Sequence, residues 1–113
     1  MIRPMLVFAA AMLPLGATAA NDFPTIERVE YVLGCVRDAQ GPPRENLYKC
    51  ACVIDAIAAQ MTYDEYVQLS TATNAFSIGG ERGEVMRAYT GGKEMAGRYR
   101  KVQADARKSC LVR

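Results

Sequence analysis

The sequence predicts an all-α fold: a small bundle of three to four helices stapled by two disulfides, following an N-terminal signal peptide. Apolar residues recur at intervals of three and four, which is the spacing of one helix face, and no segment reads convincingly as a strand. Breaks rich in Gly and Pro separate these periodic segments. Four cysteines in a chain of 113 residues with an apolar start are typical of an exported, disulfide-bonded domain.

The N-terminal segment is expected to be a signal peptide. Arg3 gives a positive start, Met5 to Leu15 forms an apolar core of the usual length, and small residues follow as a cleavage site. The apolar core is shorter than the ~20 residues that cross a bilayer, and Pro14 interrupts it. We therefore expect a signal peptide at residues 1–20, one disulfide-bonded helical domain at residues 21–113, a periplasmic location and no membrane span.

The first two helices are expected to form a hairpin. Pro24 to Arg37 and Pro43 to Gln60 each carry an apolar stripe at helical spacing. Gly41 breaks the chain between them, and Pro43 suits the first position of a helix because its missing N–H has no partner there. The predicted stripes are Ile26, Val29, Leu33 and Val36 on the first helix, with Val32 alongside, and Leu47, Cys50, Ile54, Ile57 and Met61 on the second.

Two further helices are expected downstream. Tyr63 to Thr73 follows Thr62, and Glu65 stands three residues after that threonine, which is the pattern of a capping box. The glycines of Ser77 to Glu84 predict a loop. The last helix is expected from Lys93 to Cys110. Its predicted apolar face consists of Met95, Tyr99, Val102, Ala106 and Cys110.

The four cysteines are expected to form structural disulfides. Successive helical residues turn by ~100°, so Cys50 and Cys52 point ~200° apart and cannot bond to each other without breaking the helix. Each must reach Cys35 on the first helix or Cys110 at the end of the last. In a hairpin that turns near Gly41, the position of Cys35 along the helix axis is slightly closer to that of Cys50 than to that of Cys52. This favours Cys35–Cys50 with Cys52–Cys110, and the crossed pairing stays open.

The composition argues against several chemistries. The chain contains no His, which is the commonest general base and the commonest metal ligand. No C-x-x-C motif is present, and no nucleophile, base and orienting group can be assembled from the remaining residues. We therefore expect a protein that is not an enzyme and that uses no metal or cofactor.

The charge is unevenly distributed along the chain. Residues 21–92 carry six Lys or Arg against ten Asp or Glu, whereas residues 93–113 carry seven against two. Nucleic acid is not expected as a partner of an exported protein, so the basic helix predicts an acidic surface on another periplasmic protein. Anionic membrane headgroups are a second possible target, and a solvated helix face is the alternative to any contact. The predicted partner-binding residues are Glu81 and Arg82 in the Gly-rich loop, and Arg98, Arg100 and Lys101 on the basic helix.

Several short pieces of sequence together resemble a protein family. They are YVLGCV, YKCACVIDAIA, MTYDEYV, GGERG and the final cysteine, and they extend over nearly all of the predicted domain. The combination resembles an uncharacterised family of small exported four-cysteine helical proteins of proteobacteria. The resemblance implies an association with periplasmic quinoprotein alcohol-oxidation systems.

The predicted function is that of a non-enzymatic periplasmic module that binds or assists another protein. The alternative is a cysteine-dependent redox or metal-handling accessory, linked to quinoprotein alcohol oxidation, in which Cys50 and Cys52 act. Thiolates suit Cu(I) or Zn, which is the chemical basis of that alternative. A count of free thiols separates the two hypotheses.

Overall fold

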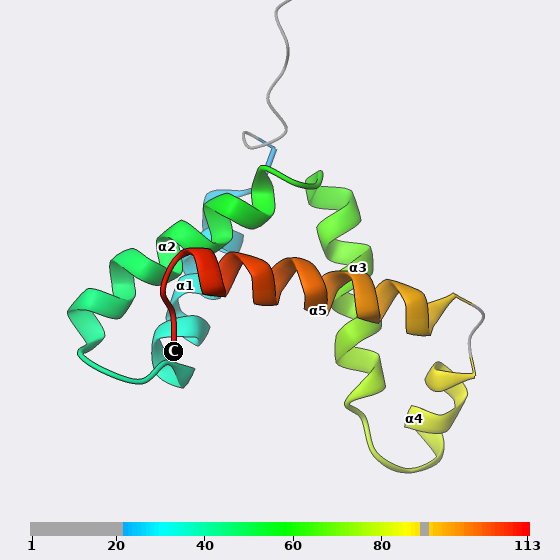
Figure 1. Cartoon of the computed structure of the whole chain (residues 1–113). Helices are drawn as coiled ribbons and strands as arrows, with labels where there is room; N and C mark the ends of the chain where they lie inside the picture. Colours follow the sequence, from blue (N-terminus) through cyan, green and yellow to red (C-terminus); the bar gives the residue numbers. More distant parts are fainter. Residues whose placement is uncertain (1–21, 89–90) are drawn as a thin grey trace, which may run out of the picture.

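The computed structural model describes residues 22–88 and 91–113, so the predicted signal peptide lies outside the described residues. Helices are the only regular secondary structure among the described residues, which confirms the all-α prediction (Figure 1). None of the described helices combines the length and the apolar character needed for a membrane span. The helices are α1 (Thr25–Asp38), α2 (Pro43–Ala58), α3 (Tyr63–Phe76), α4 (Gly80–Arg87) and α5 (Gly92–Ser109).

Helices α1 and α2 form an antiparallel hairpin. A disulfide joins Cys35 to Cys50, and Arg28 Nη1 donates to Asp55 Oδ1 at 2.6 Å, so earlier residues of α1 meet later residues of α2. Gly41 has a φ of 102°, a conformation that residues with a Cβ rarely adopt, and it allows the turn between the helices. The hairpin is therefore fixed at its turn and along its length.

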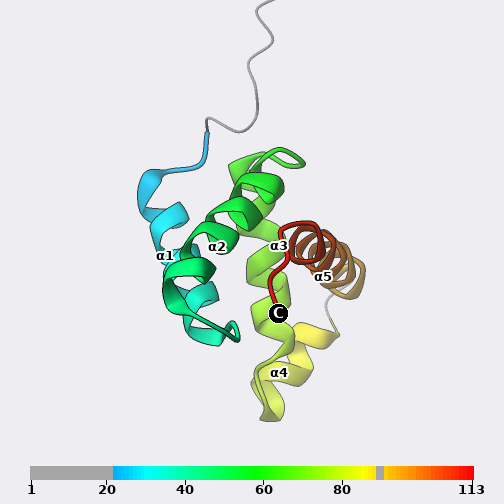
Figure 2. The same ribbon diagram turned by 60° about the vertical axis from the view of Figure 1, so that its left-hand side comes forward.

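Helix α2 lies between α1 on one side and the packed pair α3 and α5 on the other (Figure 1, Figure 2). Helix α5 crosses α3 and ends against α2, where Cys110 bonds to Cys52. The main apolar core lies where α2, α3 and α5 meet. Its buried members are Phe23, Val53, Ile54, Ile57, Ala58, Met61, Tyr66, Leu69, Tyr99, Ala106 and Cys110.

The predicted capping box at the start of α3 is confirmed. The Thr62 side chain accepts a hydrogen bond from Glu65 N at 3.3 Å, and Glu65 Oε2 accepts one from Thr62 N at 3.0 Å. These two bonds satisfy two backbone donors that would otherwise lack a partner at the helix start.

Replacing that cap gives a first prediction. Thr62→Ala removes the side-chain acceptor, and we expect the free energy of unfolding to fall by about 1 kcal/mol. Urea unfolding followed by circular dichroism measures this change. Thr71→Ala is the control, because Thr71 is an exposed threonine within α3 and lies outside the cap. An equal loss in both variants would contradict the capping account.

The predicted apolar stripe of α1 is wrong about which side of the helix packs against the core. Ile26, Val29 and Leu33 are 61%, 45% and 63% exposed, respectively. The neighbouring face, with Tyr31 and the buried Cys35, packs inward instead, together with Val32, which was predicted to lie alongside the stripe. Both faces have helical spacing, and the Cys35–Cys50 bond determines which of them turns toward α2. Leu47, at 47% exposed, likewise departs from the buried stripe of α2.

The predicted loop from Ser77 to Glu84 is wrong over its second half, because α4 begins at Gly80. Arg87 Nη1 donates to the carbonyl oxygen of Ile78 at 3.0 Å and so ties the helix to the chain that precedes it. A Cβ on Gly83 would collide with the same carbonyl group. That glycine permits close packing inside a helix, and sequence analysis misread it as a sign of a loop.

Candidate protein-binding surfaces

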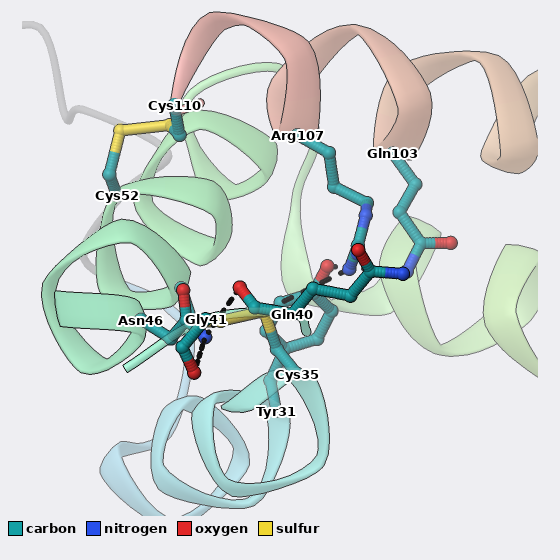
Figure 3. The surroundings of a disulfide bond; sticks show 10 residues. Tyr31, Cys35, Gln40, Gly41, Asn46, Cys52, Gln103, Arg107 and Cys110 are labelled. Carbon is teal, nitrogen blue, oxygen red and sulfur yellow. Dashed lines mark hydrogen bonds between the residues drawn. A yellow bond between two sulfur atoms is a disulfide. The ribbon is translucent and has the colours of Figure 1, made fainter. Parts of the chain in front are cut away.

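The cysteines form the favoured pairs, Cys35–Cys50 and Cys52–Cys110, and no cysteine among the described residues is free. The two bonds clamp α2 from different sides, once to α1 and once to the end of α5 (Figure 3). While both bonds are intact, these cysteines offer no thiolate to a metal or to an electrophile. Two disulfides are typical of a protein from an oxidising compartment outside the cytoplasm.

Two side chains from α5 contact residues of α1 near the Cys35–Cys50 bond. Arg107 Nη1 lies 3.9 Å from Cys35 Sγ, and Gln103 Nε2 donates to the Tyr31 hydroxyl oxygen at 3.2 Å (Figure 3). These contacts tie α5 to α1 across the edge of the hairpin. Within the described ranges there is also no group of three or more His, Cys, Asp or Glu residues that could hold a metal ion.

The predicted partner-binding residues lie on two helices and point in several directions. Glu81 and Arg82 are exposed on α4, which lies near the start of α5 (Figure 1). On α5, Arg98 and Arg100 project ~200° apart, because helical residues two positions apart face opposite sides. Arg98 Nη2 lies 3.8 Å from Glu65 Oε1 of α3, and Lys101 Nζ lies 2.7 Å from Asp105 Oδ2. These cations therefore do not form one continuous patch.

A shallow apolar groove of about 310 Å³ runs between α1 and α2, and we call it the α1/α2 groove. Val29 and Leu33 form its α1 wall, Leu47 stands on its α2 wall, and the ion pair between Arg28 and Asp55 lies within it. Its lining residues are Thr25, Arg28, Val29, Val32, Leu33, Leu47, Ala51, Ile54 and Asp55. Sequence analysis missed this surface because it placed the same residues in the core. One signal of this surface was present in the sequence: α1 has apolar residues on two faces, and only one of them can pack against the core.

A second, more polar pocket of about 570 Å³ lies where the α1–α2 turn meets the C-terminal tail, and we call it the basic pocket. Gln40 N donates to the carbonyl oxygen of Arg113 at 2.9 Å and joins the turn to the tail. Lys49 pairs with Glu45 and, with a smaller effect from Arg113, holds the pKa of the Glu45 carboxyl below its usual value. The lining residues are Gln40, Gly41, Pro42, Glu45, Asn46, Lys49, Lys108, Leu111, Val112 and Arg113.

Four aromatic rings join the N-terminal segment to α3 and α5. Phe23 lies 5.1 Å from Tyr66 and 5.5 Å from Tyr63 between ring centroids, and Tyr66 lies 6.0 Å from Tyr99. Burial raises the pKa of Tyr66 and of Tyr99 above the usual tyrosine value, and in Tyr99 the neighbouring Tyr66 adds to the shift. Burial keeps both hydroxyls in the neutral form. We therefore interpret the cluster as part of the packed core.

These raised pKa values predict that alkali destabilises the fold. A raised pKa in the folded state means that the unfolded chain loses its tyrosine protons first, so the stability that these two hydroxyls contribute is fully present below about pH 10 and falls above it. Urea midpoints measured across this range give the stability, and ultraviolet absorbance of tyrosinate reports ionisation. We expect Tyr66 and Tyr99 to ionise only as the protein unfolds. Their ionisation in a folded protein would contradict this prediction.

Comparison of this chain with protein-family models, curated proteins and solved structures finds no match. The chain is an all-helical protein with four cysteines in two disulfides, and its function must be argued from its own surfaces.

Proposed function

We propose that this protein is a non-enzymatic periplasmic module that binds another protein through the α1/α2 groove. The observation that carries the proposal is the exposure of Val29, Leu33 and Leu47 around one apolar depression. Contiguous exposed apolar surface is typical of interaction sites, whereas single exposed apolar residues are common everywhere. The two disulfides and the apolar N-terminal segment support an exported, periplasmic location.

The shape of the groove suits an amphipathic helix from the partner. Val29 and Leu33 lie four residues apart, on one face of α1, and Leu47 lines the same groove from α2. A partner helix laid beside this row would present apolar residues at the same intervals. Completing the burial of each of these half-exposed side chains would contribute about 1 kcal/mol to binding.

The groove is also held in place before any partner arrives. The Cys35–Cys50 bond and the contact between Arg28 and Asp55, which lies within the groove, fix α1 against α2. A surface that is ordered in advance loses less conformational entropy on binding. The rigidity of the groove therefore supports a role for this small domain in binding another protein.

We also propose that the partner carries an acidic surface. The excess of basic residues from Lys93 to Arg113 supports this part of the proposal. Glu81, Arg82, Arg98, Arg100 and Lys101 remain the predicted polar contacts. Because these side chains point in different directions, reversing their charges one at a time would identify which of them take part.

Binding measurements with two matched valine variants test the proposal. Val29→Asp places a charge in the groove, and Val67→Asp places the same charge on α3, where Val67 is 39% exposed and lies outside the groove lining. With the partner isolated from periplasmic extract, we expect Val29→Asp to weaken its affinity by about tenfold or more, and Val67→Asp to leave it unchanged. Equal affinities for both variants would exclude the groove as the contact surface.

One observation favours the redox alternative. The Arg107 guanidinium beside Cys35 Sγ would stabilise a Cys35 thiolate if the Cys35–Cys50 bond were reduced. The test is intact mass with a free-thiol count after mild reductant on the folded protein. One readily reduced pair would support a cysteine-dependent accessory, and two resistant bonds would rule it out. The link to quinoprotein alcohol oxidation rests on the family resemblance alone.

A further inference from the structure

We infer that the basic pocket binds a small multivalent oxyanion, such as a phosphate or a tricarboxylate. The inference does not depend on the α1/α2 groove. Leu47 lines the groove and Lys49 lines the pocket, and these residues project ~200° apart on α2. The groove and the pocket therefore open on different sides of that helix.

Charge from three elements converges on this pocket. Lys49 comes from α2, Lys108 from α5 and Arg113 from the C-terminal tail, whereas Glu45 is the one acidic side chain in the described lining. Glu45 pairs with Lys49. Within residues 22–88 and 91–113, no acidic side chain forms an ion pair with Lys108 or Arg113. Arg113 acts on Glu45 only as a weaker, more distant charge than Lys49, so the three cations of the lining outnumber its one acidic side chain.

The walls of the pocket are fixed by hydrogen bonds. Asn46 is 2% exposed, and its Nδ2 donates to the carbonyl oxygens of Gln40 at 3.1 Å and Gly41 at 3.4 Å, which fixes the turn (Figure 3). On the other side, Val112 N donates to Arg107 O at 3.0 Å, and the bond from Gln40 N to Arg113 O closes the tail onto the turn.

Leu111, which lines the pocket, has an unusual backbone conformation. It has a φ of 60°, in the left-handed region that is costly for a residue with a Cβ, and its side chain is 71% exposed. A glycine would relieve this cost at the end of α5. The leucine supplies an apolar edge beside the cations, which suits an organic anion with a short carbon frame.

The size and polarity of the pocket limit the ligand class. A volume of about 570 Å³ lies in the range of small-molecule sites. The start of α2 also lines the pocket, and the positive end of its helix dipole adds to the attraction for an anion. A multivalent oxyanion is attracted more strongly than a monovalent ion to a pocket lined by Lys49, Lys108 and Arg113, because it offsets more than one of their charges.

Nuclear magnetic resonance titration of the whole protein tests the inference, with inorganic phosphate and citrate as separate probes at constant ionic strength. We expect saturable shifts of backbone amides at the turn and tail, with the stronger response identifying a phosphate or carboxylate ligand. The double variant Lys108→Gln, Arg113→Gln should bind about tenfold more weakly or not at all. The control, Arg100→Gln, should bind as the wild type does, because Arg100 lies outside the pocket lining.

A variant with the opposite expected effect makes the test sharper. Glu45→Gln removes the carboxylate that competes for Lys49, so it should bind the same probe more tightly. No saturable shift with either anion would overturn the inference. So would equal binding by the wild type and the double variant, or shifts spread evenly over the exposed face of α5.

Discussion

Loss of the Cys52–Cys110 disulfide is expected to lower the free energy of unfolding by about 4 kcal/mol, the largest effect of any change considered for this protein. The bond closes a loop with a sequence separation of 58 residues, and it holds the end of α5 against α2. Most of its stabilisation comes from restricting the unfolded chain, and longer loops give more. Since small domains have a total stability of about 5–10 kcal/mol, the variant Cys52→Ala, Cys110→Ala should be close to unfolding.

The other disulfide is the natural control. Cys35–Cys50 closes a loop with a separation of 15 residues, for which the same relation gives about 3 kcal/mol. Equilibrium urea unfolding of the two double variants gives both values. We expect the Cys52–Cys110 variant to be the less stable of the two. The reverse order would show that native packing around Cys35, including the Arg107 contact, outweighs loop entropy.

Truncating the core of α2 is expected to have the second largest effect. Ile57 is fully buried where α2 meets α3 and α5, so Ile57→Ala removes buried apolar contacts and leaves a cavity. We expect a loss of about 3 kcal/mol in the free energy of unfolding. Chemical unfolding monitored by circular dichroism measures it.

The matched control comes from the stripe that sequence analysis placed in the core. Leu33 is 63% exposed, and alanine favours helices, so Leu33→Ala should change stability by less than about 0.5 kcal/mol. If Leu33→Ala instead destabilised the protein as strongly as Ile57→Ala, the predicted stripe would belong to the core and the α1/α2 groove would not exist as described.

Features with a local physical cause could be predicted from the sequence. The divergent directions of Cys50 and Cys52 follow from helix geometry, and the structure confirms both the separation and the favoured pairing. The capping box of Thr62 and Glu65 depends on residues three apart, and it is present. The buried face of α5, with Tyr99 as a member, follows from regular spacing on a helix that has a single apolar side.

Features that depend on tertiary contacts could not be predicted in the same way. Helix α1 has apolar residues on two faces, and spacing alone does not say that the face with Cys35 turns inward while Leu33 turns outward. Glycines are common in loops, so Gly83 was predicted to lie in one. Its actual role, a close approach to Ile78, exists only in the folded chain and leaves no local signal in the sequence. The α1/α2 groove and the basic pocket both join residues distant in sequence, so neither has a local signature.

Site-specific photo-crosslinking in the producing cell tests the central claim most directly. A photoreactive residue replaces Leu33 in the groove, and the same residue replaces Val67 on α3 as a control on a different helix. We expect one discrete adduct with a periplasmic protein from position 33 and none from position 67. An adduct from position 67 alone, or none from position 33 while the purified partner still binds, would contradict the groove as the recognition surface.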